Sequence, residues 1–204
     1  VKANGRRQVT ETGKGVLIGI IDSGFDLSHP LFRDSSNKLR VDALLDQTVP
    51  GNPVSYTKAQ LETSWSNGSN TTNAPGSDEN GHGSHVAGIA GGTKFGAFEG
   101  IASDARFLLV KTNFRDTADG ISWIFNKAGT KACVVNMSLG THWGSHDGTS
   151  AEEMLIDQLS GAGKIVVVSA GNERSDRIHI GHRFVPNEQQ TVTFDDPLSS
   201  AEPR

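Results

Sequence analysis

The segment Gly15-Val-Leu-Ile-Gly-Ile-Ile-Asp22-Ser-Gly24 is an apolar run that ends abruptly in a carboxylate and a glycine. Polar and apolar residues do not alternate in it, which is typical of a parallel strand that is buried on both faces. Three similar runs follow, at residues 107–110, at 133–135 with a continuation to 139, and at 165–168. We therefore predict four buried strands in one parallel sheet.

Helical patterns lie between these runs. Residues 117–127 place their apolar side chains on one face, and residues 150–161 begin with a capping signal and end in glycine. Residues 82–91 are rich in Ala, Gly and Val, which suits a helix packed closely into the interior. A short helix is expected after Thr57, which forms a capping box with Gln60. This alternation predicts an α/β fold, a parallel sheet flanked by helices on both sides in three layers.

Two segments depart from this alternation. Residues 46–81 are long, polar and dense in Ser, Thr, Asn and Gly, and long loops of this kind in compact domains are usually functional or mobile. The tail at 173–204 contains one strand-like alternation, at 191–194, and ends in polar residues.

Composition excludes several classes of protein. The 204 residues carry a net charge of −4 without a clustered basic face, so no nucleic-acid partner is expected. No apolar run is long enough to cross a bilayer, so no membrane partner is expected either. The single cysteine, Cys133, excludes an internal disulfide framework and a multi-cysteine zinc site.

Polar residues gather where the expected strands end, which is where open parallel sheets place their functional groups. Asp22 ends the first strand, Asn172 follows the fourth, and His82 opens a helix. A carboxylate can orient an imidazole that takes up a proton, and an asparagine amide can donate to a developing oxyanion. These three groups together suggest acyl transfer. Each alone has a simpler interpretation: a turn residue, a packed helix histidine or a loop asparagine.

The expected helix at residues 82–91 could instead carry a metal site. His82 and His85 are three residues apart and could both bind a metal, but no third protein ligand stands at a clear spacing. We therefore assign no metal ligand.

Four motifs carry a family resemblance. They are Gly15 to Gly24, His82-Gly-Ser-His-Val-Ala-Gly88, Val135-Asn-Met-Ser-Leu-Gly140 and Ala170-Gly171-Asn172. In this order and spacing the chain resembles the subtilase family of subtilisin-like serine proteases, with Ser84 where threonine is usual. The order aspartate before histidine is also that of subtilisin.

The resemblance implies a role for each motif. Asp22 would orient His82, His82 would act as general base, and Asn172 would donate to the oxyanion. Ser138, Leu139 and Gly140 would bind an extended peptide through their backbone. The implied fold is the subtilisin-like, Rossmann-like three-layer arrangement.

The family's nucleophile lies in a Gly-Thr-Ser-x-Ala motif downstream of the asparagine, and nothing after Asn172 matches it. The only Gly-Thr-Ser precedes the fourth strand and continues as Ser150-Ala-Glu-Glu153, which is a capping box. We therefore interpret Ser150 as a helix cap. Residues 1–172 are expected to form the front part of a subtilase catalytic domain that is incomplete at its C-terminus, with 173–204 the start of an insertion or a truncated remainder.

These features predict a serine endopeptidase whose nucleophile lies outside the chain, so that this piece alone is inactive. The alternatives are a non-catalytic peptide-binding or regulatory protein of the same fold, and one half of a split protease. The resemblance implies peptide or protein substrates and an extracellular or cell-surface location. No cofactor is expected to be required. Many subtilases bind calcium, but no calcium site can be placed here. The open end of the sheet predicts self-association.

Overall fold

The computed structural model describes residues 10–65, 74–141, 144–173, 183, 185–189 and 191, together with the backbone at 2–3 and 6–7. The chain divides into two compact units, Val1–Gly171 and Asn172–Arg204. The helices are α1 (Lys58–Ser64), α2 (His82–Gly91), α3 (Thr117–Ala128) and α4 (Ala151–Leu159), with a 3-10 turn at Pro30–Phe32. The strands are β1 (Lys2–Ala3), β2 (Arg6–Arg7), β3 (Leu17–Asp22), β4 (Val41–Asp46), β5 (Val54–Thr57), β6 (Arg106–Lys111), β7 (Cys133–Met137) and β8 (Lys164–Val168).

The main sheet has six strands in the order β5-β4-β6-β3-β7-β8. All neighbours run parallel except β4 and β5, which form an antiparallel pair at one edge. The predicted α/β class is confirmed, and β3, β6, β7 and β8 lie at the four predicted apolar runs. The prediction that all four strands are buried is wrong for β8, which is the edge strand and has no buried residue. The sequence pattern did not predict β4 and β5. Because these two strands pair antiparallel, the sheet is mixed rather than wholly parallel. The four-residue β5 is too short to stand out in a polar segment, and its pairing with β4 forms only in the folded sheet.

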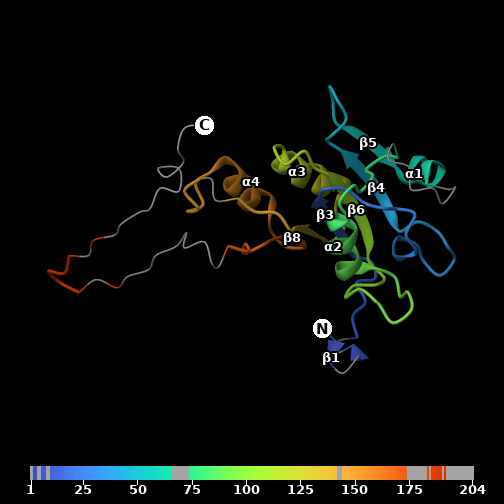
Figure 1. The fold of residues 1–204 in the computed structure, drawn as a ribbon, viewed down its shortest axis with the longest axis horizontal. Helices are drawn as coiled ribbons and strands as arrows, with labels where there is room; N and C mark the ends of the chain where they lie inside the picture. Colours follow the sequence, from blue (N-terminus) through green and yellow to red (C-terminus); the bar gives the residue numbers. More distant parts are fainter. Residues whose placement is uncertain are drawn as a thin grey trace, which may run out of the picture. The chain divides into compact units, whose positions relative to one another are not determined.

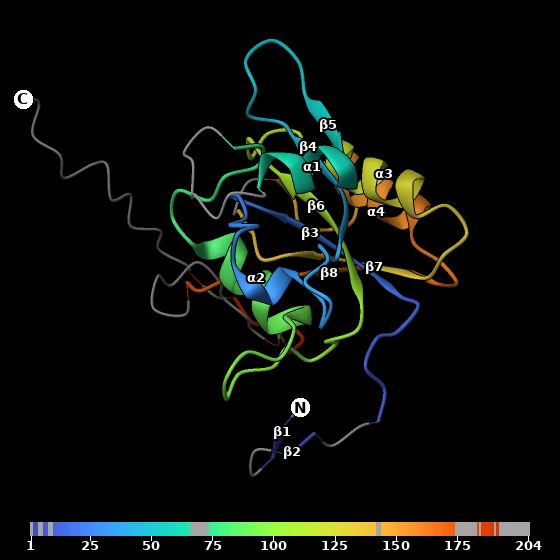
Figure 2. The ribbon, with the colours of Figure 1, turned by 90° about the vertical axis from the view of Figure 1, so that its right-hand side faces the viewer.

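Both faces of the sheet are covered over most of its width. Successive side chains of a strand point to opposite faces, so Ile18 and Ile20 of β3 pack in one cluster with α1 and α2 residues, whereas Leu17 and Ile21 pack in the other. The second cluster contains the apolar residues of α3 and contacts from α4. Figures 1 and 2 show α2 on one side of the sheet and α3 and α4 on the other. The three-layer arrangement therefore follows from strands that are apolar on both faces.

The predicted helix starts are present. Thr57 and Gln60 form a capping box at α1, and Ser150 and Glu153 form one at α4. The helix rich in small residues, α2, covers His82–Gly91 as predicted. The strand-like alternation at 191–194 lies outside the described residues apart from Thr191. None of the described helices is long and apolar enough to cross a bilayer.

A buried arginine, only 4% exposed, joins the segments around β4 and α2. The Arg40 guanidinium donates to the Gly91 carbonyl at 2.8 Å, to the Thr93 hydroxyl at 2.7 Å and to the Ala105 carbonyl. The Arg40 Cζ atom also lies 5.3 Å from the centre of the Phe107 ring. One side chain thus satisfies several buried acceptors that no regular element pairs.

We expect Arg40→Met to lower the free energy of unfolding by about 2–4 kcal/mol, because buried carbonyls would lose charged donors. Arg115→Met is the matched control, since Arg115 is exposed. Urea unfolding of both variants measures the difference. Equal unfolding midpoints for the two variants would show that the Arg40 bonds contribute nothing to stability.

Candidate active site

An aspartate and a histidine meet at the carboxyl edge of the sheet. His82 Nδ1 lies 2.7 Å from Asp22 Oδ1, although 60 residues separate them in the chain. The Asp22 side chain is fully buried, whereas 51% of the His82 side chain is exposed. With Nδ1 engaged by the carboxylate, Nε2 is the ring nitrogen left to exchange protons with a reacting group. This arrangement can support a general base.

The strand period explains why Asp22 faces α2. Asp22 follows Ile18 and Ile20 on the face that α2 covers, while Ile21 points to α3. The Asp22 carboxylate is also held from its own strand end, because the Ser23 backbone N–H donates to Oδ1 at 2.8 Å. The second oxygen, Oδ2, is buried and has no hydrogen-bond partner within the described part of the chain.

The loop ahead of α2 fixes the position of His82. Asn80 Oδ1 accepts from the His82 backbone N–H at 2.7 Å and from the Ser23 hydroxyl at 3.1 Å, so one amide links both sides of the site. Asp78 accepts from the Gly81 N–H at 2.8 Å and from the Ser84 N–H at 2.9 Å. The sequence analysis missed Asn80 and Asp78. The available signal was a pair of Asx residues just before a helix start, where such side chains bond free N–H groups.

Ser84, the residue that departs from the family motif, keeps a structural role. Its hydroxyl donates to Asp78 Oδ2 at 2.6 Å and accepts from the Asp26 backbone N–H at 2.8 Å. The hydroxyl therefore ties the first turn of α2 to the loop that follows Asp22. Serine makes both bonds without the methyl group of threonine.

The helix approaches the aspartate strand so closely that only glycine fits between them. A Cβ atom built on Gly83 would lie 2.1 Å from the Gly24 carbonyl oxygen and 3.0 Å from the Asp22 Cβ. On the same helix, a Cβ on Gly88 would meet nothing closer than Leu31 Cδ2 at 3.4 Å. The short distance between His82 and Asp22 thus depends on Gly83.

We expect Gly83→Ala to destabilise the fold by about 2–3 kcal/mol through overpacking against the backbone. Gly88→Ala is the matched control and should be neutral or stabilising, because alanine is the better helix former. Urea unfolding distinguishes the two variants. A Gly83→Ala protein as stable as Gly88→Ala would contradict the close approach.

The expected peptide-binding segment lies beside this pair. The β3–β7 register pairs Ile21 with Met137, so Ser138 comes one step beyond the paired residues, as Asp22 does. The Ser169 hydroxyl donates to the Leu139 carbonyl at 2.6 Å and holds the segment against the end of β8. Within the described ranges, the Ser138 carbonyl and the Gly140 N–H have no hydrogen-bond partner. The peptide-binding role of Ser138, Leu139 and Gly140 stays a prediction.

Two other residues of the sequence analysis have a defined place. Ser150 caps α4: its hydroxyl accepts from the Glu153 N–H, and its own N–H donates to the Glu153 carboxylate at 3.0 Å. Asn172 is the first residue of the second unit, and its backbone N–H donates to Glu173 Oε2 at 2.6 Å. Its oxyanion role stays a prediction.

The side chains that most often bind metal ions are scattered among the described residues. No group of three or more His, Cys, Asp or Glu side chains gathers among them where it could hold one.

A mostly parallel sheet between helical layers, with an Asp–His pair at the carboxyl ends of its strands, matches the architecture of the serine proteases of the α/β class. The chain matches the model of the subtilase family over residues 13–202, and it belongs to that family.

Two curated relatives are similar over most of this chain. A cuticle-degrading serine protease of Arthrobotrys oligospora is 29% identical over 185 residues, which are 87% of this chain and 37% of the relative. An extracellular serine proteinase of a Thermus species is 29% identical over 176 residues, 85% of this chain and 35% of the relative. This chain thus spans little more than a third of the length of these relatives.

Solved structures share the fold. The Clostridium perfringens CspB protease superposes with a TM-score of 0.70 at 30% identity, covering 80% of this chain and 37% of that one. MycP1 with its N-terminal propeptide removed gives a TM-score of 0.51 at 23% identity, covering 79% of this chain and 44% of that one, and shows the fold alone.

Proposed function

We propose that this chain is the front part of a subtilisin-like serine endopeptidase that hydrolyses peptide bonds through an acyl-enzyme, and that the nucleophilic serine lies outside these 204 residues. The observation that carries the proposal is the 2.7 Å contact between the buried Asp22 carboxylate and the half-exposed His82 imidazole. Family membership supports the reaction class. No Gly-Thr-Ser-x-Ala motif follows Asn172, which supports the placement of the serine.

Each residue then has a defined step. His82 Nε2 takes the proton of the serine hydroxyl as its oxygen attacks the scissile carbonyl, and Asp22 stabilises the imidazolium that forms. The Asn172 side-chain amide donates to the oxyanion of the tetrahedral intermediate. His82 then returns the proton to the leaving amine, and water hydrolyses the acyl-enzyme by the same route. Ser138 and Gly140 supply the carbonyl and N–H that hold the substrate backbone.

The test uses the natural full-length protein and the protein of residues 1–204 side by side. We expect a serine-directed fluorophosphonate to label the full-length protein, which should also hydrolyse casein. The protein of residues 1–204 should be neither labelled nor active. Hydrolysis that a serine reagent leaves unaffected would contradict the proposed mechanism.

Two other candidates give different results in this experiment. A full-length protein that binds peptides but is neither labelled nor active would be the non-catalytic member of the family. Labelling that appears only after a separate chain is added would identify a split protease.

The name of the Thermus relative supports the further proposal that the parent protein is extracellular.

We also propose that residues 1–204 self-associate through β8. Ile165, Val167 and Val168 are 52%, 47% and 55% exposed, and no strand pairs with the outer side of β8 among the described residues. Exposed strand edges with apolar side chains pair readily with other chains. Light scattering should show dimers or larger species, and Val167→Lys should reduce them. A stable monomer would contradict this proposal.

A further inference from the structure

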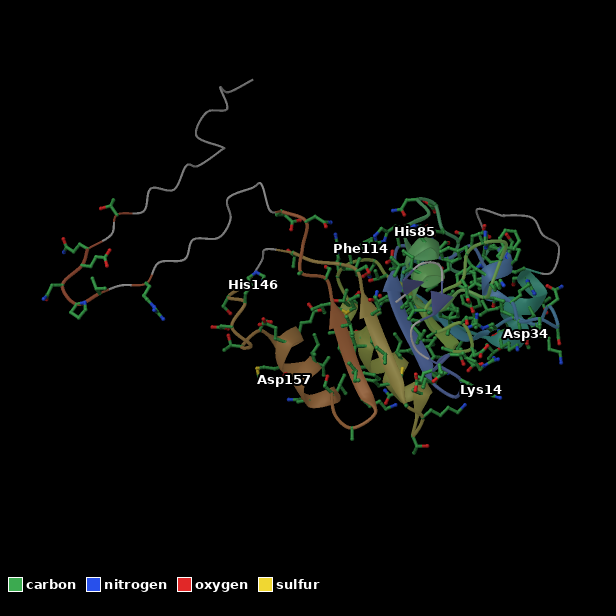
Figure 3. The ribbon with its side chains drawn as sticks, turned by 90° about the horizontal axis from the view of Figure 1, so that it is seen from below. Lys14, Asp34, His85, Phe114, His146 and Asp157 are labelled. Carbon is green, nitrogen blue, oxygen red and sulfur yellow. The ribbon has the colours of Figure 1, made fainter. Side chains whose placement is uncertain are left out.

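A cavity of about 330 Å³ opens beside the proposed peptide-binding segment, within the Val1–Gly171 unit. Leu139 forms the wall of the cavity next to the peptide-binding segment. Phe114 and Ile156 add further apolar surface. In Figure 3, Phe114 appears between His146, on the loop ahead of α4, and His85, on α2. Leu139 and Gly140 belong to the segment that is proposed to hold the substrate backbone, so a substrate side chain next to them would lie at the cavity.

The lining carries two acidic side chains. Glu152 and Glu153, in the first turn of α4, both line the cavity, and His146 is the only other ionisable residue among the described lining residues. That lining contains no lysine or arginine. Among the described residues, the cavity thus combines an apolar wall with negative charge and no lysine or arginine.

The two carboxylates are not equivalent. Glu153 is committed to the cap of α4, where its hydrogen bonds from Ser150 hold the pKa of the Glu153 carboxyl below its usual value. Glu152 accepts one hydrogen bond, from the Thr117 hydroxyl at 2.5 Å. A carboxylate has about four acceptor sites, so Glu152 retains the capacity to accept from a ligand.

We propose that this cavity selects a lysine or arginine side chain of the peptide substrate and that Glu152 is the residue that binds its charged group; this inference rests on the proposed endopeptidase function. The aliphatic stem of the side chain packs against Phe114, Leu139 and Ile156. Its cationic head donates to the Glu152 carboxylate, a charge-assisted bond that is stronger than a neutral one. Glutamate or aspartate at the same substrate position would face two like charges.

The test compares pairs of peptides that differ only in charge. Arginine and its neutral isostere citrulline are placed at each position of a fluorogenic peptide in turn, and kcat/KM is measured for the full-length protein. We expect arginine to be preferred about tenfold or more at one position, because a hydrogen bond to a charged group contributes on the order of a tenfold factor or more.

Glu152→Gln should abolish this preference, so that the arginine and citrulline peptides are hydrolysed with equal kcat/KM. Glu153→Gln is the matched control, because glutamine can also complete a capping box. It removes a neighbouring charge without removing the proposed acceptor, so it should reduce the preference only slightly.

The outcomes separate this inference from the function on which it rests. Hydrolysis without a preference for arginine, or with a preference that Glu152→Gln leaves unchanged, overturns the basic-residue cavity while the endopeptidase stands. Hydrolysis of no peptide overturns the endopeptidase. Equilibrium binding of the arginine and citrulline peptides to the full-length His82→Ala variant then tests the cavity on its own, and equal affinities overturn it.

Discussion

Replacing His82 with alanine in the full-length protein is expected to lower kcat by about 10⁶-fold, the loss seen when the histidine of a subtilisin triad is removed. His82 has its Nδ1 on a buried carboxylate and its ring half exposed, so the variant removes the only base that the described site presents to a substrate. The unfolding midpoint should fall only modestly, because half of the ring is exposed and the Ser23 backbone N–H still donates to the buried Asp22 carboxylate. Hydrolysis of a peptide anilide measures kcat, and urea unfolding measures stability.

His85→Ala is the control for this experiment. His85 lies on the same helix, three residues later, and its side chain is exposed. Its replacement should leave kcat within about twofold of the wild type, as expected for an exposed residue outside the reacting groups. Comparable losses in the two variants would favour a metal held by both histidines and would contradict the proposed general base.

The second large effect concerns Asp22. We expect Asp22→Asn to reduce kcat by about 10⁴-fold, because an amide neither fixes the imidazole tautomer nor stabilises the imidazolium. The stability should change by less than about 1 kcal/mol, since the variant removes a buried charge and Oδ2 already lacks a partner within the described residues.

A surface carboxylate provides the comparison for Asp22. Asp157 is exposed on α4, and Asp157→Asn should alter neither activity nor stability. If Asp22→Asn kept wild-type kcat, the 2.7 Å contact with His82 would be structural only. If it unfolded the protein, the contact would have to be tested instead through the NMR signal of the shared proton.

The sequence by itself determined the elements whose cause is local. Four apolar runs predicted β3, β6, β7 and β8, because a continuous apolar run is a local signal that needs no partner to be recognised. That β8 lies half exposed at the edge of the sheet was decided by the strand order. The capping boxes at Thr57 and Ser150 predicted two helix starts, since their bonds span only three residues. Strand-end and helix-start motifs likewise predicted Asp22 and His82 as site residues.

Only the tertiary structure decided the features that join distant segments. The β4–β5 pair, the Arg40 bonds and the Asn80 bridge between the two sides of the site connect residues far apart in sequence, and no local pattern encodes such contacts. The 2.7 Å distance between His82 Nδ1 and Asp22 Oδ1 requires that Asp22, like Ile20, lies on the face of the sheet that α2 covers. It also requires the absence of a Cβ atom at Gly83. The acidic cavity likewise forms only where α4 packs beside the end of β7, because its lining comes from separate elements.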